Sequence, residues 1–175
     1  MCVMETRRIS QSDGDLLRDL HLRMYADSPD AFSESLATAQ AMTAEQWDAR
    51  ARQLSEPEQA VAFVAMVGPE PVGFIAGFVG RWRDGAMHWG TRDTVTLAKA
   101  WVDPRHRRKG IGRSLAETVK AWAVEQGATT LGAQVTETNA PAIRFYAALG
   151  FTDSGRREPL LSNPTLQIRF LSRSL

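Results

Sequence analysis

The sequence contains a single cysteine, Cys2, so no disulfide within the chain can stabilise the fold. No apolar run approaches the roughly 20 residues that cross a bilayer as a helix, and the first residues lack the apolar core of a signal peptide. The sequence also lacks an excess of charge of one sign, because 21 basic and 20 acidic residues leave a formal net charge of +1. These shortages argue against a disulfide-stapled secreted domain, a membrane protein and a general attraction for nucleic acid. We expect a cytoplasmic protein.

The composition is that of a globular domain, with 43% hydrophobic and 23% charged residues in a chain of 175. No internal repeat, low-complexity tract or linker divides the chain, so residues 1–175 are expected to form a single α/β domain. Apolar segments predict strands over residues 6–9, 60–67, 72–79, 94–102, 129–135, 151–157 and 165–171. Helical spacing and capping residues predict helices that begin near residues 12–15, 43, 111 and 139.

Side-chain caps are expected at the first two helices. A Ser12 or Asp13 oxygen is expected to cap the first helix, and Thr43 with Gln46 forms the pattern of a capping box at the second. The polar and aromatic segment 81–93 is expected to be a loop.

The most informative stretch is 102–115, where an apolar strand, a basic turn with two glycines and an amphipathic helix follow one another. The first N–H groups of a helix have no partner inside the helix, and the peptide dipoles leave partial positive charge there. Gly110 and Gly112 carry no side chain that would keep a phosphate from those groups. Full positive charge is added by Arg107, Arg108 and Lys109. The pattern predicts a phosphate site.

The flanking segments predict where this site lies. The strand 94–102, the helix that begins at 111 and the strand 129–135 form a crossover unit, which makes the two strands parallel neighbours. The phosphate site then lies at the carboxyl end of the first strand, where α/β sheets place ligands.

Two segments carry a resemblance to a known family. Arg107-x-x-Gly110-x-Gly112 after a strand resembles the acyl-CoA pyrophosphate loop of the GNAT superfamily of acyl-CoA-dependent N-acetyltransferases. The run Asn139-x-x-Ala142-Ile143-x-Phe145-Tyr146-x-x-x-Gly150-Phe151 is similar to the segment that follows in that family. The resemblance implies a central mixed, mostly antiparallel twisted sheet of six to seven strands, flanked by about four helices. A parallel strand pair is implied around the acyl-CoA site.

The resemblance also implies a set of site residues and acetyl-CoA as the acyl donor, without a metal. The implied cofactor-binding residues are Trp101, Val102, Arg107, Arg108, Lys109, Gly110, Ile111, Gly112, Arg113, Asn139 and Tyr146. Tyr146 matches the general acid of the family, and Asn139 would face the pantothenate arm or the thioester. The alternative for Tyr146 is a core residue whose hydroxyl is bonded within the protein.

Acetylation of an amine requires loss of a proton, because an aliphatic amine has a pKa near ~10.4. The strand 94–102 carries no carboxylate, and Gln134 occupies a position that often holds Glu in peptide N-terminal acetylators. The base is therefore left open among Asp93, Glu137, His88 and ordered water. Cys2 is isolated near the terminus, which favours direct transfer over a cysteine-linked acyl-enzyme.

The acceptor is expected to contact the loops 27–35 and 81–93, with a further contribution from 156–164. The candidate substrate residues are Phe32, Trp82, His88 and Trp89. Phe32 has the alternative of covering the core. The same loops hold Asp84 and Asp93, which suit a cationic amine, and Arg81, Arg83 and Arg92, which suit a carboxylate. We expect a small primary amine, such as an amino-acid-like metabolite, a polyamine or an amine antibiotic, ahead of a peptide N-terminus.

Other classes fit the sequence less well. A dinucleotide oxidoreductase would need a third glycine where Leu115 stands. A non-catalytic acyl-CoA-binding sensor stays open, because the strand 94–102 lacks a carboxylate. The expected partners are acetyl-CoA and an amine acceptor, with a homodimer allowed and neither nucleic acid nor membrane expected.

Overall fold

The computed structural model describes residues 4–56, 58–83, 86–88 and 92–175, with the backbone alone described for 82, 83, 86 and 87. A seven-stranded sheet runs through the molecule in the order β1-β2-β3-β6-β7-β9-β8. Its strands are β1 (Met4–Arg8), β2 (Ala60–Val67), β3 (Glu70–Val79), β6 (Thr94–Val102), β7 (Thr130–Thr136), β8 (Thr152–Leu160) and β9 (Asn163–Ser174). All neighbours are antiparallel except β6 and β7. The expected mixed, mostly antiparallel sheet with one parallel pair is confirmed.

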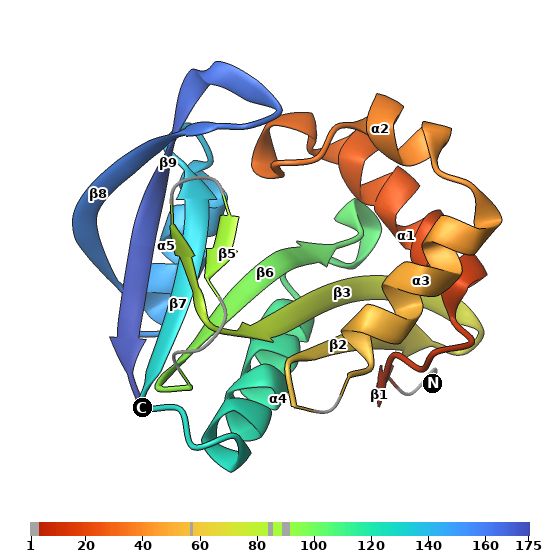
Figure 1. Cartoon of the computed structure of the whole chain (residues 1–175), viewed down its shortest axis with the longest axis horizontal. Helices are drawn as coiled ribbons and strands as arrows, with labels where there is room; N and C mark the ends of the chain where they lie inside the picture. The colour runs from red at the N-terminus through yellow and green to blue at the C-terminus, as the bar shows by residue number, and fades with distance from the viewer. Residues whose placement is uncertain (1–3, 57, 84–85, 89–91) are drawn as a thin grey trace.

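Helices cover both faces of this sheet (Figure 1). The α-helices in the described part of the chain are α1 (Gly14–Asp27), α2 (Leu36–Ala41), α3 (Ala44–Leu54), α4 (Ile111–Glu125) and α5 (Ala140–Ala148). Two short 3-10 turns, η1 (Pro29–Ala31) and η2 (Pro104–His106), follow α1 and β6. None of the described helices combines the length and the apolar character that a membrane span requires.

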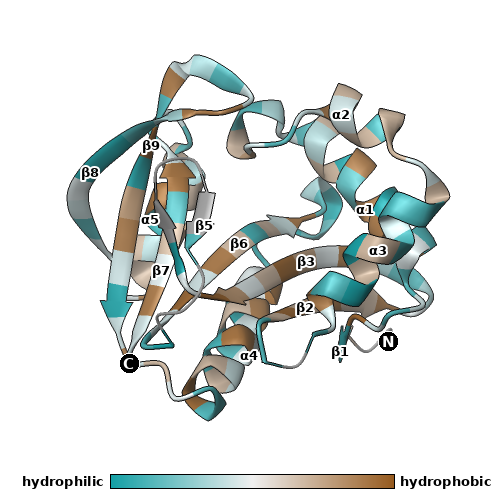
Figure 2. Ribbon diagram, in the orientation of Figure 1, coloured by the Kyte–Doolittle hydropathy of each residue, from teal (hydrophilic) through white to brown (hydrophobic). Residues whose placement is uncertain are grey.

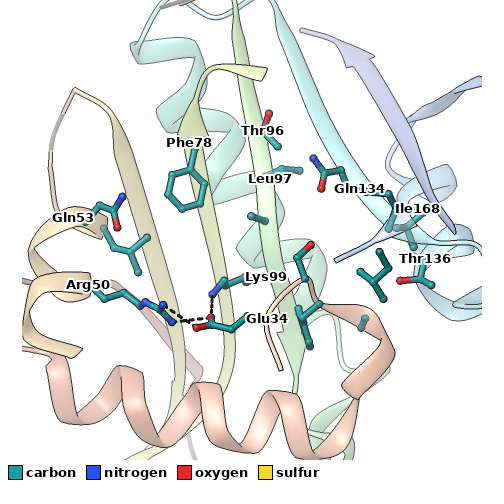
Figure 3. Close-up of a pocket in the computed structure, with 17 residues that line it drawn as sticks. Glu34, Arg50, Gln53, Phe78, Thr96, Leu97, Lys99, Gln134, Thr136 and Ile168 are labelled. Carbon is teal, nitrogen blue, oxygen red and sulfur yellow. Dashed lines mark hydrogen bonds and ion pairs between the residues drawn. The ribbon is translucent and has the colours of Figure 1, made fainter. Parts of the chain in front are cut away.

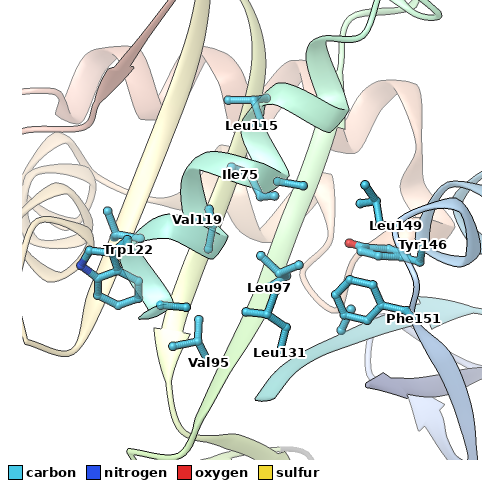
Figure 4. Close-up of a cluster of buried hydrophobic side chains, with 14 of the residues drawn as sticks. Ile75, Val95, Leu97, Leu115, Val119, Trp122, Leu131, Tyr146, Leu149 and Phe151 are labelled. Atoms are coloured by element: carbon cyan, nitrogen blue, oxygen red, sulfur yellow. The ribbon is translucent and has the colours of Figure 1, made fainter. Parts of the chain in front are cut away.

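Two hydrophobic cores lie on opposite faces of the sheet. The first joins the sheet to α4 and to the end of α5, and Figure 4 shows Ile75, Val119 and Trp122 on one side of it with Tyr146 and Phe151 on the other. The second joins the sheet to α1 and α3 and contains side chains such as those of Leu20 and Trp47. Figure 2 shows the same division, with hydrophobic residues along β2, β3 and β6 and hydrophilic ones on the outer side of α3. Burial of apolar area on both faces is what fixes the sheet between the helices.

The parallel pair separates before β6 ends. β6 and β7 pair only from Thr94 with Thr130 to Leu97 with Ala133, although β6 continues to Val102. On its other side β6 is irregular as well, because its register against β3 shifts around Lys99 and Ala100. This bulge turns the end of β6 away from β7 and opens the sheet there.

The helix starts are partly as expected. Thr43 and Gln46 form the predicted capping box at α3, and the Asn139 side chain accepts a hydrogen bond from the Ala142 N–H at 3.2 Å. The cap expected at α1 is wrong, since no side chain accepts from its first turn. The Asp13 carboxylate instead accepts hydrogen bonds from Arg7 and from the Ser10 N–H, which ties the helix start to β1.

Two short elements were not expected from the sequence. Residues 81–93 are not wholly a loop, because β4 (Arg81–Arg83) and β5 (Ala86–His88) pair as a small antiparallel hairpin. The helix α2 is also additional and is capped by Ser35, whose hydroxyl accepts from the Thr38 N–H. Both elements are too short to show a periodic pattern of apolar residues.

The capping box at α3 provides a stability test. Thr43→Ala removes the oxygen that accepts from the Gln46 N–H, so we expect the free energy of unfolding to fall by about 1 kcal/mol. Denaturant unfolding with an unchanged slope measures this loss. Thr43→Ser keeps the oxygen and should unfold close to the parent protein. Equal destabilisation by both substitutions would contradict a capping role.

Candidate functional site

The separation of β6 from β7 is flanked by two cavities. The larger cavity has a volume of about 470 Å³ and takes in Ala100, Trp101 and Val102 of β6. The smaller cavity has a volume of about 380 Å³ and takes in residues 96–99 of β6 and 134–136 of β7. Ala31 and Phe32 line both cavities. Both volumes are in the range of sites for small ligands.

The larger cavity collects most of the predicted cofactor residues. Those that line it are Trp101, Val102, Arg107, Arg108, Gly110, Ile111, Gly112, Arg113, Asn139 and Tyr146. Lys109 is the exception, since its ammonium lies 3.3 Å from the Arg105 carbonyl and its side chain is not part of the cavity wall.

The start of α4 forms one end of the larger cavity. Gly110 is the N-cap with a φ of 82°, and the first intrahelical bond runs from the Ser114 N–H to the Gly110 carbonyl at 3.0 Å. The N–H groups of Ile111, Gly112 and Arg113 therefore lack partners within the helix. A Cβ atom at Gly110 would meet nothing within 4 Å, so the approach to these N–H groups is open.

Gly112 has a different role from the one expected. A Cβ atom there would lie 3.3 Å from the Phe145 ring and 3.7 Å from Val102, rather than in the path of a ligand. The absence of a side chain lets the first turn of α4 pack closely against α5. Gly110 alone thus matches the prediction of an open approach.

The arginines of the turn are held to different degrees. Arg107 donates to the Val102 carbonyl at 2.9 Å and forms an ion pair with Asp27 at the end of α1. Asp27 also accepts from the Trp101 indole at 2.9 Å, so it links α1 to the end of β6. Arg108 is exposed at the cavity and makes no hydrogen bond to the residues that the structure describes. Its guanidinium is available to an anionic ligand.

Tyr146 of α5 also lines the larger cavity. Its side chain is 5% exposed and packs edge to face against Phe145 and Phe151, with ring centroids 5.2 and 5.3 Å away. The hydroxyl makes no hydrogen bond to any described residue, which differs from the alternative of a bonded core tyrosine. Burial raises the pKa of Tyr146 to about 12, so the phenol keeps its proton at neutral pH.

Asn139 and Glu137 follow β7 but differ in position. Asn139 lines the larger cavity, although its side-chain oxygen is used in capping α5. Glu137 lies in the wall of neither cavity, and its carboxylate accepts from Arg157 at 2.6 Å with Arg169 at 3.6 Å. The structure therefore gives Glu137 a place in the link between β7, β8 and β9.

The predicted acceptor residues whose side chains the structure describes, Phe32 and His88, do not share a cavity. Phe32 is buried, packs against Tyr25 and lines both cavities, so it covers the core as the alternative expected, and it also borders the space in which a substrate role is predicted. His88 is exposed on β5, and among the described residues it belongs to neither cavity wall. Trp89 and the side chain of Trp82 lie outside what the structure describes. Asp93 is exposed and pairs with Arg81 at 2.9 Å.

The ionic residues of the smaller cavity were missed by the sequence reasoning. Figure 3 shows Glu34, Arg50 and Lys99 directed toward one another within this cavity. The Glu34 carboxylate accepts from Arg50 at 2.9 and 3.0 Å, from the Tyr25 hydroxyl at 2.7 Å and from Lys99 at 3.1 Å. Two signals point to them: Lys99 interrupts an apolar strand, and Arg50 falls on the buried face of α3.

Backbone strain marks both cavities. Among the described residues other than glycine, only Lys99 and Arg108 have positive φ angles, of 55° and 60°. Such angles are unfavourable for a side chain with a Cβ atom and persist where the surrounding structure imposes them. Each of the two residues lies in the wall of one cavity. The strain is thus concentrated at the opening between β6 and β7.

Comparison with known proteins identifies the class of this fold and site. The model of the acetyltransferase (GNAT) family matches residues 21–151. The chain therefore belongs to this family. The matched residues include α4, α5 and the residues of β6 that line the two cavities.

Individual relatives match over shorter stretches. Streptothricin acetyltransferase of Streptomyces lavendulae is 43% identical over 67 residues, which are 38% of this chain and 34% of that protein. The [ribosomal protein bS18]-alanine N-acetyltransferase of Escherichia coli K12 is 39% identical over 62 residues, which are 35% of this chain and 42% of that protein. The aligned parts thus cover well under half of either relative.

Solved structures agree with the fold over almost the whole chain. An acetyltransferase of the GNAT family from Streptococcus pneumoniae has a TM-score of 0.80 at 16% identity and covers 99% of both chains. A Salmonella typhimurium protein solved with its cofactor acetyl-CoA has a TM-score of 0.75 at 21% identity, with 99% of this chain and 94% of that chain covered. At these identities the likeness concerns the fold alone.

Proposed function

We propose that this protein transfers the acetyl group of acetyl-CoA directly to a primary amine of a small molecule. The observation that carries the proposal is the larger cavity, whose lining includes both the open start of α4 and Tyr146. The first of these suits a phosphate and the second supplies a proton donor. A pyrophosphate-bearing thioester needs both.

The residues of the larger cavity suit acetyl-CoA at each part of its length. The free N–H groups at the start of α4 and the Arg108 guanidinium suit the pyrophosphate, as backbone donors and full charge do at other phosphate sites. The end of β6 beyond Leu97 has no β7 partner, so its backbone groups at Trp101 and Val102 can bond the amide-bearing pantothenate arm. Ala142 and Phe145 provide an apolar wall.

The chemistry is divided between the two cavities. Tyr146 is placed to protonate the departing thiolate, because its phenol is neutral and its hydroxyl is unbonded. The amine is expected to enter from the smaller cavity past Phe32, which borders both spaces. None of the candidate bases Asp93, His88 and Glu137 lies in a cavity wall, and Asp93 and Glu137 are ion-paired, so we assign removal of the amine proton to ordered water.

A small acceptor is supported by the shape of the smaller cavity. Its walls come from three directions: the segment 31–34, α3 with β6, and the far end of the sheet at Leu160 and Ile168. Its volume of about 380 Å³ suits a small ligand better than an extended peptide. Gln134 of β7 lines this space, where a glutamate would favour the ammonium of a peptide N-terminus.

Release of free CoA thiol in the presence of acceptor panels tests this proposal. We expect turnover with small primary amines and little with peptides that carry free N-termini, because the smaller cavity is bounded on several sides. Acetylated products identified by mass spectrometry exclude simple hydrolysis. Turnover confined to peptide N-termini would overturn the small-molecule acceptor, and thiol release with no amine requirement would overturn amine acetylation.

A further inference from the structure

The ionic residues of the smaller cavity do not balance. Its described lining includes one acidic residue, Glu34, and two basic residues, Arg50 and Lys99. Burial alone would raise the pKa of Glu34, but the Arg50 hydrogen bonds and the Lys99 charge lower it to about 2, so this side chain is a carboxylate. Burial lowers the pKa of Lys99 to about 8, which leaves it mostly protonated at neutral pH. One positive charge therefore remains without a counter-ion in the cavity wall.

Most of the acceptor capacity of Glu34 is already used within the protein. Its oxygens already accept four hydrogen bonds, from Tyr25, from Lys99 and two from Arg50. Its side chain is 17% exposed, against 23% for Arg50 and 25% for Lys99. The two cations are thus at least as accessible as the carboxylate between them.

Unused donors line the same space. The Lys99 ammonium bonds to Tyr25 at 2.7 Å and to Glu34 at 3.1 Å, which leaves one of its N–H groups free. The side-chain amides of Gln53 and Gln134 line the cavity and make no hydrogen bond to the residues that the structure describes. A cavity with spare donors and excess positive charge, in which the one carboxylate of the described lining is already paired with two cations, is complementary to an anion.

We propose that the acceptor carries an anionic group, of the kind that an amino acid carries as its carboxylate, and that Lys99 and Arg50 bind this group in the smaller cavity. The inference rests on the proposed function and narrows its substrate class. The positions of the residues agree with it, since Lys99 lines the smaller cavity while the next residue, Ala100, lines the larger one. An acceptor anchored at Lys99 therefore extends its amine across the opening between β6 and β7.

The test compares amino acids with their carboxamides, which share the side chain and the amine but lack the negative charge. We expect the parent protein to acetylate the acids with a kcat/KM about 10-fold or more above that for the carboxamides, because charge-assisted hydrogen bonds form only with the acids. Comparing this acid-to-amide ratio between variants cancels the different pKa values of the two amines.

Two variants should move the ratio in opposite directions. Lys99→Met removes the excess charge and should lower the acid-to-amide ratio by about 10- to 100-fold. Glu34→Gln adds to the excess positive charge at nearly constant shape and should raise the ratio. A merely structural disturbance would lower turnover of both acceptors together and leave the ratio unchanged. Lys99→Arg should restore the preference for acids, and Arg50→Gln serves as a second charge-removing variant if Lys99→Met does not fold.

The outcomes separate this inference from the proposed function. Two results would overturn the anionic acceptor alone. One is acetylation of the carboxamides, or of amines without an anionic group, as fast as that of the acids. The other is an acid-to-amide ratio that neither Lys99→Met nor Arg50→Gln changes. Absence of CoA release with every small amine would overturn the proposed function as well. CoA affinity, measured in parallel, should stay at the parent value in each variant, because none of the three substituted residues lines the larger cavity.

Discussion

Replacing Tyr146 with phenylalanine is expected to lower kcat by about 10²- to 10⁴-fold while the affinity for CoA stays nearly unchanged. The substitution removes a hydroxyl that makes no hydrogen bond to the described residues, from a residue that lines the larger cavity. The buried ring keeps its contacts with Phe145 and Phe151. Loss of turnover would then come from the thiolate, which leaves without a proton donor.

Stability separates this role from a structural one. Because the Tyr146 hydroxyl has no partner to lose, Tyr146→Phe should leave the melting temperature unchanged or slightly higher. Steady-state kinetics, calorimetry with CoA and thermal unfolding on one preparation measure the three quantities. Normal turnover together with a lower melting temperature would show that the tyrosine serves the core instead. Burial raises the pKa of Tyr146 to about 12, so the phenol keeps its proton as the pH rises toward 10. Deprotonation of Tyr146 should therefore not lower the activity of the parent protein in this pH range.

The second large effect is expected at the start of α4. Gly110→Trp should lower the affinity for CoA by at least about 100-fold, because the side chain would occupy the open approach to the free N–H groups. Loss of two charge-assisted hydrogen bonds, each worth about 1.5–3 kcal/mol, accounts for this factor. Titration calorimetry with CoA measures it directly.

The other end of the same helix offers a matched control. Gly127 has a φ of 80°, and a Cβ atom there would also meet nothing within 4 Å. Gly110→Trp and Gly127→Trp should therefore share a strain cost of about 1–2 kcal/mol. Only the first lies at the larger cavity, so only the first should lose CoA affinity. Equal affinities in the two variants would place the phosphate site elsewhere.

More of the proposed cofactor half of the site than of the proposed acceptor half could be predicted from the sequence. The strands at 60–67 and 94–102 and the start of α4 at Ile111 are confirmed with the predicted bounds, because apolar periodicity and glycine positions are local properties of the chain. The proposed phosphate end of the larger cavity is likewise formed mainly by one continuous stretch. Its free N–H groups come from a strand, a turn and a helix start that follow one another in the chain.

The acceptor half is assembled from distant parts of the chain. Glu34, Arg50 and Lys99 come from a loop, a helix and a strand, and 65 positions separate the ion pair of Lys99 with Glu34. Residues 81–93 were predicted to contact the acceptor because they combine aromatic and charged side chains. The described members of that segment line neither cavity. The composition of a segment alone does not predict which charged residues form ion pairs in the folded protein.

The sequence by itself determined the family fold, the parallel strand pair and the glycine-led start of α4, since each depends on residues that are neighbours along the chain. Only the tertiary structure decided that the Tyr146 hydroxyl makes no hydrogen bond to the described residues and that Glu137 is held by Arg157. It also decided that a partly buried cluster with excess positive charge lines the smaller cavity. Ion pairing and burial depend on which segments the sheet brings together, and that arrangement is a property of the whole fold.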